Sequence, residues 1–133
     1  MINDSYNANP ESMKAAIDVL KNFKSKRRIA VLGTMGELGD KSCRMHEEVG
    51  KYAGENSVDI LIVLGEYIED FKGGFHVTNK KGKCISFDTY EKALEFLLKK
   101  YIAQGDTVLV KASRAMKFET IAEELKRTAI IRR

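Results

Sequence analysis

The stretch Arg28-Ile29-Ala30-Val31-Leu32-Gly33 is a short apolar run that ends in glycine. Two other runs have the same character: Asp59-Ile60-Leu61-Ile62-Val63-Leu64-Gly65 and Thr107-Val108-Leu109-Val110-Lys111. Such near-continuous apolar runs are typical of parallel strands that are buried on both faces of a sheet. Residues 84–87 (Cys-Ile-Ser-Phe) predict a shorter fourth strand.

Helical patterns separate these strands. Pro10 suits a first helical position because proline lacks only an amide hydrogen that the start of a helix leaves unpaired. Thr89 can cap a later helix. The apolar stripes at helical spacing are Met13, Ala16, Ile17, Leu20 and Phe23; Met45, Val49, Tyr52 and Ala53; Tyr90, Ala93, Leu94, Leu97, Leu98, Tyr101 and Ile102; and Met116, Ile121, Ala122 and Leu125. Residues 66–82 are polar and are predicted to be irregular, with Gly73-Gly74 as a flexible point.

The alternation of strands and helices predicts the fold class. It indicates βαβ units with right-handed crossovers, and therefore an α/β, three-layer, Rossmann-like domain with a mainly parallel sheet flanked by helices. We expect residues 1–133 to form one such domain. Ligands bind beyond the carboxyl ends of the strands in these folds. Loops 33–41 and 111–116 are therefore the candidate ligand loops, and the polar N-terminal segment should lie near the same edge if it serves the same site.

The composition is that of an ordinary globular protein: 133 residues, 44% hydrophobic and 32% charged, with a net charge of +4. No apolar run approaches the ~20 residues that span a bilayer, and no signal peptide is visible. The basic run Lys24, Lys26, Arg27 and Arg28 lacks interleaved aromatic residues, which favours a solvated turn over a nucleic-acid site. Cys43 and Cys84 lie far apart, so we expect free thiols in a reducing cytoplasm.

The segment 33–42 (Gly-Thr-Met-Gly-Glu-Leu-Gly-Asp-Lys-Ser) is rich in glycine. It is not the G-x-G-x-x-G of dinucleotide-binding folds, and Asp40 interrupts the consecutive G-K-S that a P-loop requires. Two interpretations remain open: a structural turn between strand and helix, or a wall of a substrate site. His46, in the following helix, is interpreted as a packing or capping residue rather than as a catalyst.

Residues 111–117 (Lys-Ala-Ser-Arg-Ala-Met-Lys) form a second candidate loop. A strand delivers Lys111, a turn presents Ser113 and Arg114, and a helix is expected to begin there. Free amides at a helix start, a hydroxyl and a guanidinium can together bind a carboxylate or a phosphate. The alternative is an exposed basic turn.

Three segments carry a family resemblance. Residues 4–10 (Asp-Ser-Tyr-Asn-Ala-Asn-Pro) resemble the D-S-Y-N-A-N-P motif of the Mur ligases. Residues 32–39 resemble the family's L-G-D-M-x-E-L-G, with Thr34 in place of the aspartate. Residues 111–119 resemble K-G-S-R-x-M-K-M-E, with Ala112 for the glycine and Phe118 for the second methionine. His46 also follows at the family's spacing. The three motifs occur in the family's order and cover essentially the whole chain.

The resemblance implies an ATP-dependent amide ligase, of the subgroup that adds D-alanyl-D-alanine to a UDP-N-acetylmuramoyl tripeptide in peptidoglycan precursor synthesis. It implies that Asp4 faces the ATP ribose or its metal region and that Tyr6 packs near the nucleotide. Asn7 and Asn9 would bind nucleotide or substrate. Ser113 and Arg114 would hold the dipeptide carboxylate, and the rest of the substrate site would comprise Thr34, Met35, Glu37 and Lys111. No catalytic residue and no metal ligand is expected among these.

The resemblance is to one domain of three. The family's central ATPase domain carries a P-loop, which this sequence lacks, so we expect an excised or truncated C-terminal domain that is inactive alone. ATP and Mg²⁺ would then be used by the full-length enzyme and not bound by this chain by itself. The expected partners are D-alanyl-D-alanine, the UDP-tripeptide and the missing domains, with no nucleic acid and no membrane. Two alternatives remain: a related ligase, such as folylpolyglutamate or cyanophycin synthetase, and a free-standing Rossmann-like binding or interaction domain.

Overall fold

The structure, a computed structural model, describes residues 2–3, 9–36, 38–101 and 106–111. The strands form a five-stranded sheet in the order β1-β5-β2-β3-β4, and every pairing is parallel. The strands are β1 (Ile2–Asn3), β2 (Arg27–Leu32), β3 (Ile60–Val63), β4 (Lys83–Ser86) and β5 (Asp106–Lys111). The helices are α1 (Pro10–Lys21), α2 (Ser42–Glu55), α3 (Ile68–Thr78) and α4 (Tyr90–Phe96), with a 3-10 turn at Gly39–Lys41 and a π-helical turn at Leu97–Tyr101.

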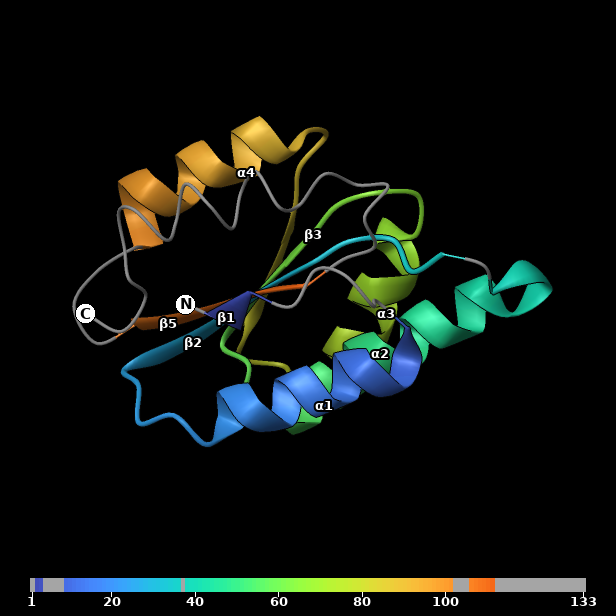
Figure 1. Ribbon diagram of the computed structural model, residues 1–133, viewed down its shortest axis with the longest axis horizontal. Coiled ribbons are helices and arrows are strands. Elements are labelled where there is room, and N and C mark those ends of the chain that lie inside the picture. The colour runs from blue at the N-terminus through green and yellow to red at the C-terminus, as the bar shows by residue number, and fades with distance from the viewer. Residues whose placement is uncertain (1, 4–8, 37, 102–105, 112–133) are drawn as a thin grey trace.

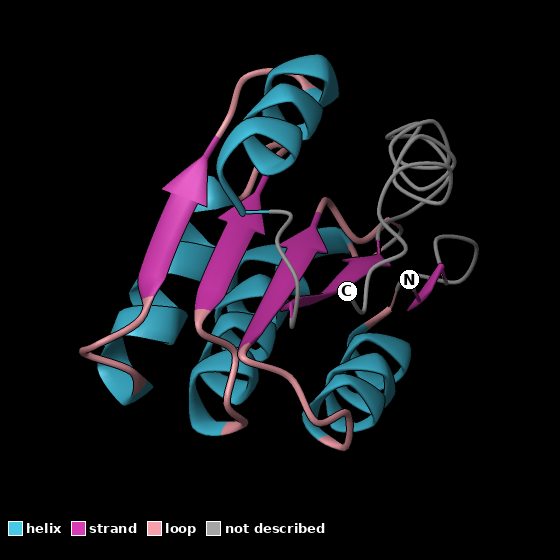
Figure 2. Ribbon diagram, turned by 90° about the vertical axis from the view of Figure 1, so that its left-hand side faces the viewer, coloured by secondary structure: helices cyan, strands magenta, loops and turns pink. Residues whose placement is uncertain are grey.

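The helices cover both faces of the sheet. Helices α1, α2 and α3 lie on one face and α4 lies on the other (Figure 1), so that the sheet is the middle of three layers (Figure 2). Strands β1, β2, β3 and β4 follow one another in one direction across the sheet, and right-handed crossovers therefore place their connecting helices on one side. The return from β4 to β5 runs the opposite way and places α4 on the other side. The predicted fold class is confirmed.

The core lies mainly between the sheet and helices α1 to α3. All four residues of β3 and the last four of β2 are buried, as the apolar runs predicted. The residues of this core are Met13, Ala16, Ile17, Leu20, Ala30, Leu32, Met35, Val49, Ala53, Val58, Leu61, Val63, Phe71, Phe75 and Leu109. The predicted stripes of α1 and α2 supply six of them. The helix expected around Met116 lies outside the described residues.

The prediction of irregular structure for residues 66–82 is wrong. Helix α3 occupies most of this stretch and buries Phe71, Gly74 and Phe75. Gly74 is a buried contact point in this helix and not the predicted flexible point: a Cβ built on it would lie 2.0 Å from the backbone oxygen of Glu47 in α2. A Cβ on Gly50 of α2 would lie 2.3 Å from the backbone oxygen of Phe71. The glycines therefore let α2 and α3 pack backbone against backbone.

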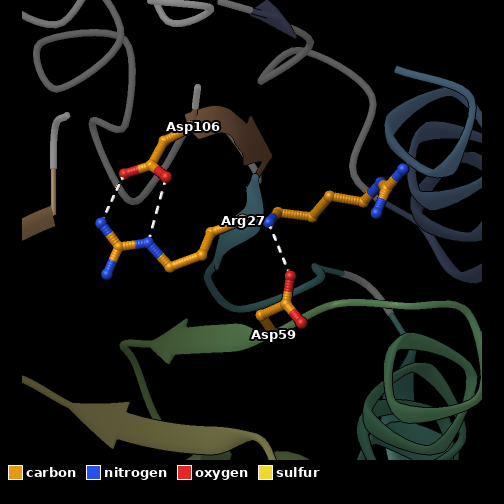
Figure 3. A network of polar contacts seen from close by, with 4 residues as sticks. Arg27, Asp59 and Asp106 are labelled. Carbon is orange, nitrogen blue, oxygen red and sulfur yellow. Dashed lines mark hydrogen bonds and ion pairs between the residues drawn. The ribbon is translucent and has the colours of Figure 1, made fainter. Parts of the chain in front are cut away.

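Both arginines of the basic run have structural partners, and the Arg27–Asp106 pair lies at the end of the sheet where β2 and β5 begin (Figure 3). Arg27 pairs with Asp106, its register partner on β5. Arg28 donates from Nη2 to the backbone oxygen of Phe23 at 2.6 Å and from Nε to that of Leu20 at 3.3 Å, so that it caps the carboxyl end of α1. The solvated-turn interpretation therefore holds for the exposed Lys24 and Lys26 but not for these arginines.

Candidate functional site at the carboxyl edge of the sheet

The strand register brings the candidate loops to one edge of the sheet. Leu32, the last residue of β2, pairs with Lys111, the last residue of β5, and also with Val63, the last residue of β3. On the other side of β5, Asn3 pairs with Val110. The carboxyl ends of β1, β2, β3 and β5 therefore lie at the same edge, which is where ligands bind in open parallel sheets. Asn3, which precedes the polar N-terminal segment, lies at this edge, and residues 4–8 lie outside the described residues.

The described part of loop 33–41 is held from two sides. Thr34 Oγ1 accepts a hydrogen bond from the backbone N–H of Glu66, in the turn after β3, at 3.3 Å. Thr34 stands where the family has aspartate, and its hydroxyl still supplies an acceptor. The Met35 side chain is buried in the core, so Met35 anchors the loop to the core. Gly39 has φ +59°, a conformation that favours glycine, just before α2.

His46 of α2 fastens the same loop. Its side chain is fully buried. Its Nε2 accepts a hydrogen bond from the backbone N–H of Met35 at 2.9 Å. Its Nδ1 lies 2.7 Å from the backbone oxygen of Ser42. Because a carbonyl oxygen can only accept, Nδ1 must carry the hydrogen and donate, and Nε2 must be unprotonated. The two bonds together fix one neutral tautomer.

The surroundings of His46 favour this neutral form. Its ring stacks on Tyr67 with centroids 4.2 Å apart and meets the edge of Phe71 at 5.0 Å. Burial lowers the pKa of His46 below its ordinary value, against the opposing influence of the Ser42 backbone bond and of the Asp70 and Glu66 carboxylates. With both ring nitrogens occupied, His46 has no free position for proton transfer to a ligand. This confirms its interpretation as a packing residue and adds a positional role.

Asn9 of the N-terminal segment begins α1. Its Oδ1 accepts from the Ser12 backbone N–H at 2.9 Å, and Ser12 Oγ accepts from the Asn9 backbone N–H at 3.0 Å. This reciprocal capping box satisfies two amides at the helix start, with Pro10 at the first helical position as predicted. Asn9 is exposed, so the capping role does not remove it from the surface near the site.

Other candidate residues fall outside what the structure describes, or are described only in their backbone. Lys111 ends β5 at the candidate edge. Asp4, Tyr6, Asn7, Glu37, Ser113 and Arg114 lie outside the described residues. The turn after β3, with Glu66 and Tyr67, is a part of the site that the sequence analysis missed, because its only visible signal was polarity. No group of three or more metal-ligating side chains occurs in the described part of the chain.

The cysteines take no part in the site. Both are free thiols, as expected. Cys43 is exposed, and Cys84 is half-buried. Burial raises the pKa of Cys84 to about 12, which keeps it protonated and a poor nucleophile. Within the described ranges, no helix is both long enough and apolar enough to cross a membrane.

Comparison with known proteins defines the class. The family described as "Mur ligase, glutamate ligase domain" matches residues 1–114, which is most of the chain. The chain belongs to this family. The motifs at residues 4–10 and 32–39, and the strand that delivers Lys111, all lie within the matched range.

Several curated relatives share one functional name. The UDP-N-acetylmuramoyl-tripeptide--D-alanyl-D-alanine ligase of Bacillus subtilis is 36% identical over 126 residues, which cover 94% of this chain and 27% of that enzyme. The ligase of the same name from Haemophilus influenzae is 36% identical over 131 residues, or 95% of this chain and 27% of that enzyme. The chain thus spans about a quarter of the length of the curated relatives it matches.

Solved structures that are similar to this chain include ligases of the same type. A crystal structure of MurF from Acinetobacter baumannii matches with a TM-score of 0.79 at 32% identity, over 94% of this chain and 27% of that one. The MurF ligase of Thermotoga maritima, solved in complex with ADP, matches with a TM-score of 0.70 at 32% identity, over 93% of this chain and 27% of that one. The fold at the candidate edge is therefore shared with enzymes of this type.

Proposed function

We propose that this chain is the C-terminal domain of an ATP-dependent ligase that joins D-alanyl-D-alanine to a UDP-N-acetylmuramoyl tripeptide. The strands that lead into the motif segments end at one sheet edge, through the pairs Leu32–Lys111 and Asn3–Val110, and this observation carries the proposal. The names of the relatives, which match at 36% identity, supply the reaction.

In this reaction the tripeptide carboxylate oxygen takes the γ-phosphoryl group of ATP, which gives an acyl phosphate and ADP. The amine of D-alanyl-D-alanine then attacks the acyl carbon. Phosphate leaves with the former carboxylate oxygen, and the amine loses a proton as the amide forms. The contribution of a C-terminal domain is positioning, because amine and acyl phosphate must meet in near-attack geometry with water excluded.

The dipeptide site would lie between the loops after β2 and β5. Ser113 and Arg114 would hold the carboxylate of the dipeptide, with Thr34, Met35, Glu37 and Lys111 around it. The register supports this assignment because the loop that begins at Gly33 starts beside the end of β5. Since the Met35 side chain is in the core, only its backbone can line the site.

The nucleotide would lie near the segment after β1, against Asp4, Tyr6, Asn7 and Asn9. The ADP complex of the Thermotoga maritima relative supports nucleotide use by the proposed enzyme. The described residues fit this assignment in position: β1 ends at the candidate edge and Asn9 is exposed. ATP supplies the phosphoryl group, and Mg²⁺ would neutralise its phosphates with ligands from the other domains. A cytoplasmic location follows from these substrates.

Kinetics of the full-length enzyme test the proposal at Arg114. A guanidinium can bind a carboxylate through two parallel bonds, whereas lysine keeps the charge and loses the fork. Because a charge-assisted hydrogen bond contributes about 1.5–3 kcal/mol, Arg114→Ala should raise the KM for D-alanyl-D-alanine by roughly ten- to a hundredfold. Arg114→Lys should give a smaller rise, and the KM for ATP should change much less.

The outcomes separate the alternatives. Phosphate release by the wild-type enzyme that does not depend on D-alanyl-D-alanine would reject the proposed reaction in favour of another ligase or a binding domain. An unchanged dipeptide KM in both Arg114 variants would reject the carboxylate cradle. Parallel changes for all three substrates would make Arg114 a contact between domains.

A further inference from the structure

We propose that His46 is a positioning residue for the dipeptide: by holding the backbone of Met35, it keeps the loop after β2 in the conformation that receives this substrate. The inference rests on the proposed function for the identity of the substrate. The contact itself, Met35 N–H to His46 Nε2 at 2.9 Å, is independent of that function.

Losing His46 Nε2 as its acceptor would be energetically costly for the Met35 amide. The hydrogen bond is buried, and a buried N–H that loses its acceptor costs the desolvation of that group. Without Nε2 the loop would have to move until the Met35 amide reached water or another acceptor. Because the Met35 side chain is anchored in the core, this movement would involve the backbone on both sides of it, which includes Thr34 and Gly36.

His46 is itself held rigidly. Its Nδ1–H donates to Ser42 in its own helix at 2.7 Å, and Tyr67 covers one face of its ring. Tyr67 follows Glu66, whose backbone N–H donates to Thr34. The loop after β2, the turn after β3 and the start of α2 thus form one connected unit. Such preorganisation lowers the ordering cost that a ligand would otherwise meet on binding.

This unit lies next to the proposed dipeptide cradle. Leu32 pairs with Lys111, so the loop after β2 begins beside the carboxyl end of β5, the strand that leads toward the proposed cradle. A displacement of about 1 Å in such a wall is enough to lower the rate of a bimolecular reaction by orders of magnitude. The acceptor nitrogen of His46 therefore acts on the reaction through Met35, without touching substrate.

Three substitutions of His46 in the full-length enzyme separate the contributions of its ring packing, its bond to Ser42 and its bond from Met35. His46→Phe keeps a packed ring between Tyr67 and Phe71 and removes both nitrogens. His46→Asn keeps a donor that can reach Ser42 but is too short to reach Met35. His46→Gln is long enough to place an acceptor near the position of Nε2.

We expect the Phe and Asn variants to raise the KM for D-alanyl-D-alanine by about tenfold or more, since the Met35 amide loses its acceptor. The KM for ATP should stay within about twofold, and the Gln variant should recover most of the dipeptide affinity. If the Asn variant had wild-type kinetics, the bond to Ser42 within α2 would be sufficient and the bond from Met35 would not matter, which would overturn the inference. Equal rises in all three KM values, or a Gln variant no better than Phe, would also overturn it.

Hydrogen exchange of the Met35 amide gives a readout that needs no activity. It should be slow in the wild type and the Gln variant and at least tenfold faster in the Asn and Phe variants, because loss of the buried acceptor costs enough free energy for such a change. Equal exchange in all four proteins would reject the role of His46 even if a variant were too unstable to assay. If exchange behaves as expected while the wild-type enzyme shows no dipeptide-dependent turnover, the proposed function has failed and the contact stands.

Discussion

Arg27 and Asp106 are register partners on neighbouring parallel strands and are joined by two hydrogen bonds, Nε to Oδ1 at 3.0 Å and Nη2 to Oδ2 at 2.8 Å. The Asp106 side chain is 2% exposed and that of Arg27 is 36% exposed. The pair lies where β2 and β5 begin (Figure 3), at the opposite end of both strands from the candidate site. It should therefore affect stability without affecting ligand binding.

The first prediction concerns this pair. Arg27→Met should lower the free energy of unfolding by about 2 kcal/mol, because the buried Asp106 carboxylate loses both bonds from Arg27. The cost is expected below the 3–5 kcal/mol typical of fully buried pairs, since Arg27 is partly exposed. Adding Asp106→Asn should recover part of this loss by removing the buried charge. Urea denaturation of the 133-residue chain measures both effects.

A matched control is available on the surface. Lys99 and Glu95 form an exposed pair one helical turn apart, with Nζ to Oε1 at 2.8 Å. Lys99→Met should leave the urea midpoint unchanged within error, because exposed pairs contribute little. If Arg27→Met were as harmless as this control, the pair would not contribute to the stability of the sheet.

The second prediction concerns the close packing of α2 and α3. Gly74→Ala should destabilise the chain by about 1–3 kcal/mol, because the new Cβ would overlap the Glu47 backbone oxygen. Its neighbour Gly73 is exposed, and a Cβ there meets nothing within 4 Å. Gly73→Ala should therefore stabilise by up to about 1 kcal/mol through helix propensity alone. Opposite signs at adjacent glycines in thermal or urea unfolding would verify the helix–helix contact, and equal signs would contradict it.

The helices and strands differ in how well they could be predicted from the sequence. The long buried strands, the Pro10 helix start and the Thr89 cap were predictable because they rest on local patterns, and Thr89 Oγ1 does accept from the Lys92 backbone N–H at 3.3 Å. Helix α3 was missed because Gly73 and Gly74 lower helix propensity, while the tertiary contact that requires a small residue at position 74 is invisible locally. The two-residue β1 is too short to give a periodic signal.

In the candidate site too, features set by local patterns were predictable and features set by tertiary contacts were not. The motif segments predicted one common edge for the site, and the register does place the ends of β1, β2 and β5 at one edge, because the carboxyl ends of parallel strands meet there. The partner of His46 could not be predicted, since it is the backbone amide of Met35, and an amide at one position looks like an amide at any other. The partners of Arg27 and Arg28 were hidden for a similar reason: one lies 79 residues away in the sequence, and the others are carbonyl oxygens.

The third prediction concerns pH. The folded chain lowers the pKa of His46, so the unfolded state binds the extra proton first as the pH falls. The contribution of His46 to stability should thus be complete above about pH 6.5, the ordinary histidine value, and should decline below it by at most about 1.4 kcal/mol per pH unit. The carboxylates of Asp70, in α3, and of Glu66 oppose this lowering of the pKa electrostatically, but burial outweighs them.

Comparison with His46→Gln isolates this effect. Glutamine cannot take up a proton, so the variant should show a flatter dependence of the unfolding free energy between about pH 5 and 7. The two curves should converge or cross as the pH falls. Parallel curves over this range would mean that His46 is as easily protonated in the fold as in the unfolded chain, contrary to its hydrogen-bond pattern.

The fourth prediction distinguishes the two roles assigned to Asn9. Its capping bond to Ser12 is observed, and its contact with nucleotide or substrate is proposed. Serine is as good an N-cap as asparagine, whereas alanine costs about 1 kcal/mol at this position. Asn9→Ser should therefore keep the melting temperature of the 133-residue chain, and Asn9→Ala should lower it by roughly 2–8 °C. Both substitutions remove the amide group, so both should reduce kcat/KM for ATP or the dipeptide in the full-length enzyme by a similar factor, about tenfold for one lost hydrogen bond. If activity instead followed stability, with the serine variant fully active and the alanine variant impaired, Asn9 would serve the site only by starting α1 at the correct residue.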